Sequence, residues 1–162
     1  MTTRRRQVAL RHVHESMVDL VAVINAPQLD EIILREAGVT LDRPLFPLLV
    51  GIQRFGPIGV VELAERAGRD HTTVSRQVAK LAGLGLVDRR PSPVDRRVRE
   101  AVISTAGRQV TDAIDAARHR LNSPVFADWS DRDLFALERL FRRYVDDLVA
   151  LAETSREQGG TT

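Results

Sequence analysis

Cysteine is absent from the 162 residues, which excludes disulfides, thiolate metal ligands and thiol-based redox sensing. There is no run of about 18 apolar residues, so we expect no membrane-spanning helix. The basic start, MTTRRRQVAL, is not followed by the apolar stretch that a secretory signal needs. These absences favour a protein of the cytoplasm.

Aromatic residues and lysine are scarce: aromatics make up 4% of the chain, and its only lysine is Lys80. The net charge is only +2, but the positive charge is concentrated. Between Arg66 and Arg99 there are nine basic residues and three acidic ones, and an excess remains when the window is widened to residues 60–100. A basic patch of this kind favours a polyanionic partner.

Apolar residues at intervals of three and four predict helices on both sides of the basic segment. We expect helices over residues 3–24, 28–37 and 42–54, and in the last of these Pro47 marks either a late start or a kink. Another helix is expected from about residue 106, and a capping sequence at Ser130–Asp133 starts the last one. The apolar stripes of the terminal helices are Leu10, Val13, Met17, Leu20 and Ile24, and Leu134, Leu137, Phe141, Tyr144, Leu148 and Leu151.

The segment VVELAERAGRDHTTVSRQVAKL predicts a helix-turn-helix, because two short helices are joined by a turn that contains glycine. Val74, Val78 and Leu81 define the buried face of the second helix. Its other face presents hydroxyls near the N-terminus and cations beyond, which suits a helix in the major groove of DNA. An amphipathic core helix with a solvated polar face is the alternative. The candidate DNA-contacting residues are His71, Thr72, Thr73, Ser75, Arg76, Gln77 and Lys80.

The next segment predicts a basic ribbon: the strands LVDRR and RVREAVIS flank the turn PSPVDR. Such a ribbon can straddle the DNA backbone and insert an arginine into the minor groove. Asp95 is expected to hold the guanidinium of Arg97 as a bidentate pair, unless the two form only a surface ion pair. The candidate residues of the ribbon are Arg89, Arg90, Asp95, Arg96, Arg97 and Arg99.

Residues 41–107 resemble the winged helix-turn-helix regulators of the MarR family. The family's D-x-R wing signature falls on Asp95 and Arg97, and its strand end and later glycine fall on Ile103-Ser104 and Gly107. Three positions depart from the pattern: Val94 replaces a polar wing-tip residue, Glu100 is charged, and Pro47 is unusual in its helix. The lack of cysteine excludes the thiol-sensing branch of the family.

The resemblance implies a mainly α fold, a winged helix-turn-helix with a two-stranded wing between N- and C-terminal dimerisation helices. The expected regions are 1–40 (N-terminal dimerisation helices), 41–105 (DNA-binding domain), 106–153 (C-terminal dimerisation helices) and 154–162 (flexible tail). It also implies a homodimer, usually a repressor, on pseudo-palindromic DNA, without a cofactor but with a small aromatic or anionic effector. The dimer contacts are expected from Leu10, Val13, Met17, Leu134, Leu137, Phe141, Tyr144 and Leu148, unless these stripes form intramolecular core.

Two other functions remain open: a non-specific architectural DNA-binding protein, and an interaction dimer that has lost DNA binding. Catalysis is not expected. The segment GLGLVD has two glycines of a dinucleotide fingerprint but lacks the third, and it ends a helix rather than opening one. A metal site is not expected either, because His12 and His14 do not share a helical face.

Overall fold

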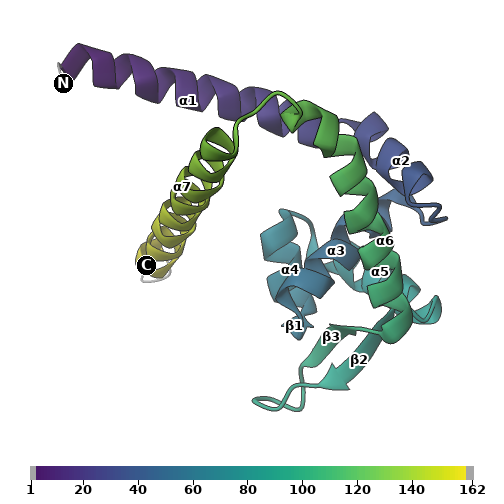
Figure 1. The fold of residues 1–162 in the computed structure, drawn as a ribbon. Helices are drawn as coiled ribbons and strands as arrows, with labels where there is room; N and C mark the ends of the chain where they lie inside the picture. Colours follow the sequence, from purple (N-terminus) through teal and green to yellow (C-terminus); the bar gives the residue numbers. More distant parts are fainter. Residues whose placement is uncertain (1–2, 160–162) are drawn as a thin grey trace. The chain divides into compact units, whose positions relative to one another are not determined.

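The computed structural model describes residues 3–159. It is mainly helical, with one small antiparallel sheet (Figure 1). The first of two units ends at His119 and the second begins at Arg120. The division falls within a helix, whereas the sequence places the end of the DNA-binding domain at residue 105. None of the described helices is long and apolar enough to cross a membrane.

Helix α1, Thr3–Ile24, has the bounds that its apolar stripe predicts. It contains no buried residue: Leu10 is 60% exposed and Val13 is 45% exposed. Helix α2, Pro27–Glu36, starts with proline in its first turn and buries Ile33 and Leu34. The N-terminal apolar stripe is therefore not part of the core of its own unit.

A short 3-10 turn, η1 (Arg43–Leu45), precedes helix α3, Phe46–Phe55. Pro47 lies in the first turn of α3, where its missing N–H costs no helical hydrogen bond. Of the two explanations for this proline, the late start is correct and the kink is wrong. Helix α3 buries Phe46, Leu48, Leu49 and Ile52.

The predicted helix-turn-helix is formed by α4, Val60–Ala67, and α5, His71–Gly83, which pack against each other and against α3. The sheet joins this core from one side. The main apolar cluster contains Leu45, Leu48, Leu49, Ile52, Ile58, Leu63, Ala64, Val74, Val78, Leu81, Val87 and Ala101.

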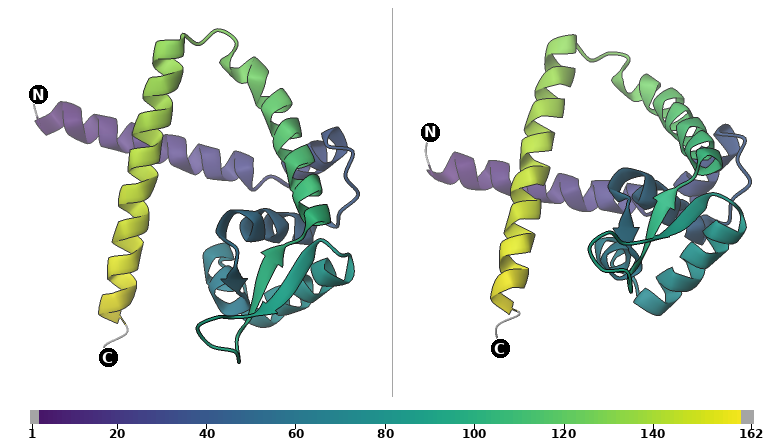
Figure 2. Two further views of the ribbon diagram at one scale, coloured as in Figure 1. Left: turned by 60° about the horizontal axis from the view of Figure 1, so that its bottom comes forward. Right: turned by 90° about the horizontal axis from the view of Figure 1, so that it is seen from below.

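The sheet has three strands in the order β1-β3-β2: β1 is Ile58–Gly59, β2 is Val87–Pro91 and β3 is Arg99–Ile103. Strands β2 and β3 form the predicted wing hairpin, with Val87 opposite Ile103 and Pro91 opposite Arg99. Figure 2 shows the turn of this hairpin at the end of the sheet that lies away from α6. Strand β1 adds a third strand that the sequence pattern does not reveal, because two residues carry no periodicity.

Helix α6, Thr105–Asn122, starts directly after β3 and buries Gly107, Thr111, Ile114 and Ala117. The buried hydroxyl of Thr111 is satisfied within the helix, since it donates to the Arg108 carbonyl at 2.9 Å. The guanidinium of Arg118 lies over the Phe46 ring, 5.2 Å from its centroid. Contacts of this kind tie α6 to the first unit, which extends to His119.

The second unit contains a 3-10 turn, η2 (Ser123–Phe126), and helix α7, Asp131–Gly159. The Ser130 cap is confirmed: its hydroxyl accepts from the Asp133 amide at 3.2 Å and donates to the Asp133 carboxylate at 2.7 Å. On α7, Leu137 is 40% exposed and Phe141 is 45% exposed. The helix continues into the segment predicted as a tail, and residues 160–162 lie outside the described residues.

Candidate nucleic-acid interface

Helix α5 begins with a glycine turn and an acidic cap. Gly68 has a φ of +60°, and the Arg69 amide after it donates to the Ala64 carbonyl at 2.9 Å. Asp70 caps α5 by accepting from the Thr73 amide at 2.9 Å and from the Thr73 hydroxyl at 3.2 Å. The hydrogen bond from the Thr73 amide is the main cause that holds the pKa of Asp70 below its ordinary value.

The two faces of α5 are separated as the sequence predicts. Val74, Val78 and Leu81 are 0% exposed. The exposed face carries the side chains that can reach base edges or phosphates, namely His71, Thr72, Thr73 and Arg76, and Ser75 is partly buried beside them. No described residue pairs with the guanidinium of Arg76. The helix thus presents hydroxyls and one free cation to solvent.

Two of the predicted contact residues of α5, Lys80 and Gln77, do not project freely from its exposed face. Lys80 forms an ion pair with Asp42, just before η1. The side-chain oxygen of Gln77 is buried and has no hydrogen-bond partner. It belongs to a separate hollow of about 290 Å³ whose other lining residues include Pro44, Arg69 and Thr73. Lys80 and Gln77 are therefore less available to an outside ligand than Arg76.

The wing turn is held by hydrogen bonds within residues 92–98. The Ser92 amide donates to the Val98 carbonyl, and the Val98 amide donates to the Asp95 carbonyl, each at 2.9 Å. The Asp95 carboxylate accepts from the Arg97 backbone amide at 2.9 Å. The predicted pairing of Asp95 with the Arg97 guanidinium is wrong, because the nearby amide takes the carboxylate. Asp95 shapes the turn and leaves the Arg97 side chain unpaired among the described residues.

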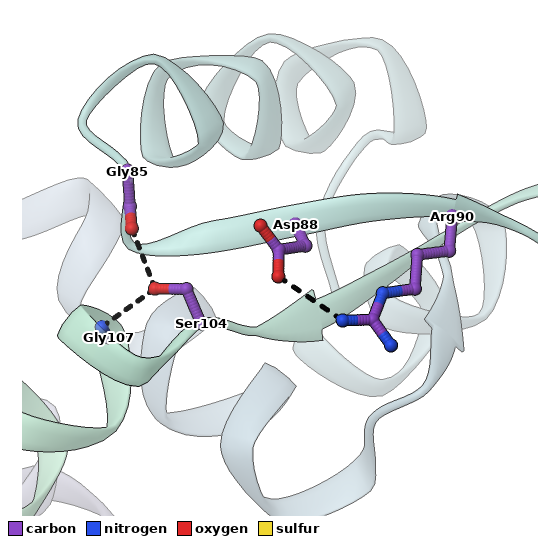
Figure 3. Close-up of polar contacts among 5 residues, drawn as sticks. All are labelled: Gly85, Asp88, Arg90, Ser104 and Gly107. Atoms are coloured by element: carbon purple, nitrogen blue, oxygen red, sulfur yellow. Dashed lines mark hydrogen bonds and ion pairs between the residues drawn. The ribbon is translucent and has the colours of Figure 1, made fainter.

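The strand register divides the wing arginines between two faces. Arg89 lies opposite Ala101, so the two side chains are on the same face of the hairpin. Ala101 on this face is buried in the core. Arg90 points to the opposite face, where it lies across from Glu100 and pairs with the Asp88 carboxylate at 3.4 Å (Figure 3). Of these two neighbours, Arg89 is the one directed toward the helix-turn-helix.

An open hollow of about 740 Å³ lies between α4, the start of α5 and the wing. Arg89, Arg97 and Arg99 line it from the wing, and their guanidinium groups make no ion pair with any described residue. The lining also includes His71 and Ser75 of α5, Glu62 and Glu65 of α4, and Glu100. Unpaired arginines beside a helix that carries hydroxyls form a surface suited to phosphates and base edges.

The described residues contain no group of three or more acidic or histidine side chains that could hold a metal ion.

Comparison with known proteins identifies this arrangement. The sequence model of the MarR family matches residues 41–98. Over 110 residues the chain is 33% identical to the HTH-type transcriptional regulator YxaD of Bacillus subtilis (strain 168), and the alignment covers 65% of this chain and 77% of that protein. The chain belongs to the MarR family of transcriptional regulators.

Solved structures of MarR-family proteins have the same fold. A MarR family protein from Bacillus stearothermophilus matches 92% of this chain and 99% of its own, with a TM-score of 0.68 and 22% identity. Staphylococcus aureus MarR in complex with salicylate and kanamycin matches 88% of this chain and 96% of its own, with a TM-score of 0.62 and 16% identity. The predicted fold class is confirmed. The homologues of this chain are DNA-binding transcriptional regulators, and their family is non-enzymatic.

Sequence reasoning missed how this MarR-family wing is fastened to its helices. The Ser104 hydroxyl donates to the Gly85 carbonyl at 2.6 Å and accepts from the Gly107 amide at 2.9 Å (Figure 3). The resemblance points to Ser104 and Gly107 as positions but assigns no role to them. A serine three residues before the glycine is the local signal of a helix cap, whereas the bond to Gly85 spans 19 residues and has no local signal.

Proposed function

We propose that this chain is a homodimeric, sequence-specific DNA-binding repressor whose operator is pseudo-palindromic. The observation that carries the proposal is the set of unpaired arginines on α5 and the wing: Arg76, Arg89, Arg97 and Arg99. In this proposal α5 lies in the major groove and Arg97 reaches the adjacent minor groove. A dimer seated on DNA blocks access to that DNA, so repression is the expected effect.

The homodimer is supported by apolar side chains that the single chain leaves exposed. Helix α1 buries none of its residues, and α7 exposes Leu137, Phe141 and Leu148 at 40%, 45% and 39%. Large exposed apolar faces mark interaction sites. A second copy with two-fold symmetry would cover them and place the two α5 helices about 34–36 Å apart, one turn of DNA.

We further propose that a small aromatic or anionic molecule modulates DNA binding, and that the protein needs no cofactor. The support for an effector is a relative, since Staphylococcus aureus MarR was solved with salicylate and kanamycin. We also propose that the protein is cytoplasmic, because a regulator that binds the bacterial chromosome works in the cytoplasm. The YxaD relative comes from a bacterium, Bacillus subtilis.

The test is selection of bound sequences from a pool of random 30-base-pair duplexes, followed by fluorescence anisotropy with the enriched duplex at two salt concentrations. We expect a two-fold-symmetric consensus and a preference over random competitor of about a thousandfold or more. Binding that random DNA abolishes equally would favour the architectural alternative. Absence of binding at low salt would overturn the DNA-binding proposal.

A further inference from the structure

The end of the recognition helix and the start of α6 meet at one hydroxyl. Helix α5 is followed by a tight turn in which Gly85 has a φ of +72°. The amides of Gly85 and Leu86 close the helix by donating to the Ala82 and Leu81 carbonyls, at 2.9 and 3.0 Å. This turn uses the amide of Gly85 and leaves its carbonyl free. The Ser104 hydroxyl donates to that carbonyl at 2.6 Å.

The same serine also fastens the other two elements of the junction. Its hydroxyl accepts from the Gly107 amide at 2.9 Å and so caps α6. Its backbone amide donates to the Leu86 carbonyl at 3.1 Å, which closes the base of the wing. Figure 3 shows the serine between the end of α5 and the first turn of α6. Helix α5, the wing and α6 are therefore joined at a single residue.

The approach of α6 to this junction is unusually close. A Cβ atom on Gly107 would lie 2.0 Å from the Leu86 carbonyl oxygen and 2.7 Å from Cδ1 of Ile103. Neither gap admits a side chain, so the first turn of α6 rests directly on the backbone of the α5–β2 turn. With so little space, Ser104 can hold the angle between α6 and α5 through short, direct bonds.

We propose that Ser104 is a positioning residue for DNA recognition: its hydroxyl sets α5 and the wing in the relative placement that lets both contact DNA at once. This inference rests on the proposed DNA-binding function. It adds to that function a residue that acts without contacting the DNA itself. The bond to Gly85 performs the positioning, and the bond to Gly107 serves mainly to cap α6.

Three substitutions of Ser104 separate the two bonds. Ser104→Ala removes both of them. Ser104→Asp keeps an acceptor for the Gly107 amide but, as a carboxylate, has no proton to donate to the Gly85 carbonyl. Ser104→Thr keeps both donor and acceptor. Ser130→Ala is the matched control, because it removes a serine helix cap of the same kind from the second unit.

The dissociation constant of each full-length variant is measured by anisotropy on the duplex selected with the unaltered protein, at 10 °C, with circular dichroism to confirm folding. We expect Ser104→Ala and Ser104→Asp to bind about five- to tenfold more weakly, the size of one net hydrogen bond. Ser104→Thr and Ser130→Ala should stay within about twofold of the unaltered protein.

A double-mutant cycle with Arg97→Ala distinguishes positioning from a general loss of stability. If Ser104 acts by placing the wing, the two losses in affinity are not additive, because a displaced wing has already lost its contact. Additive losses, or wild-type affinity in Ser104→Ala or Ser104→Asp, would overturn the inference while leaving the proposed function intact. Failure of the unaltered protein to bind any duplex would overturn both.

Discussion

At the scale of the residue, neighbouring arginines of the wing have different surroundings. Arg89 and Arg90 follow each other on β2, and the alternation of a strand sends them to opposite faces. Arg90 is paired with Asp88, whereas Arg97 and Arg89 have no ion-pair partner among the described residues. An unpaired guanidinium that lines the hollow between α4, α5 and the wing can bind a phosphate of DNA. Arg97 should therefore contribute more to DNA binding than Arg90.

We predict that Arg97→Ala weakens binding to the selected duplex on the order of tenfold and lowers the slope of log affinity against log salt by about one. The fold should survive, because the Asp95 carboxylate holds the backbone amide of residue 97 and not the side chain. Anisotropy at several salt concentrations measures both quantities.

Arg90→Ala is the matched control, since it removes the same charge from the same hairpin but from the other face. Its affinity should fall by no more than about threefold, the effect expected of general electrostatic attraction alone. Equal losses in the two variants would show that the wing acts only through its net charge.

At the scale of the element, glycines decide how closely the helices and strands approach. Gly107 lies where α6 meets the backbone of Leu86. Gly83, the last residue of α5, has open space within 4 Å of the position of its absent Cβ and no positive φ. The same substitution at these two glycines should therefore have opposite effects on stability.

We predict that Gly107→Ala lowers the free energy of unfolding by about 1–3 kcal/mol or more, since a methyl group there clashes with backbone. Gly83→Ala should raise it by about 0.5–1 kcal/mol through higher helix propensity. Urea unfolding followed by circular dichroism measures both. A Gly107→Ala protein as stable as the Gly83→Ala protein would show that α6 can shift away from the turn at little cost.

The elements also show which features a sequence can reveal. Gly68 and Val74 were predictable because a left-handed turn and a buried helical stripe depend on residues within a few positions. Asp95 was assigned the wrong partner because a carboxylate two residues before an arginine can reach its backbone amide as well as its guanidinium. The role of Ser104 could not be predicted, because its partner Gly85 lies 19 residues away in the sequence. Only the folded wing brings the two residues together.

At the scale of the whole molecule, the long terminal helices and the winged domain differ in how far their apolar side chains are buried. The winged domain has a buried apolar core, in which Leu49, Ile52, Val74, Val78 and Leu81 are all 0% exposed. Helices α1 and α7 instead leave a series of leucines, valines and phenylalanines in contact with solvent. A second copy of the chain would remove these side chains from water, and the hydrophobic gain would hold the dimer together.

We predict that Leu137→Asp converts the proposed homodimer to a monomer, because two-fold symmetry would bury the unpaired charge twice, each at a cost of about 3–5 kcal/mol. Affinity for the two-fold-symmetric duplex should fall with it. Leu84→Asp is the control: it places the same charge at a 54%-exposed site in the winged domain and should leave the mass of the dimer unchanged. Sedimentation equilibrium gives the masses. A dimer that persists in Leu137→Asp would mean that this face of α7 packs within its own chain, and the two-fold model of operator binding would lose its interface.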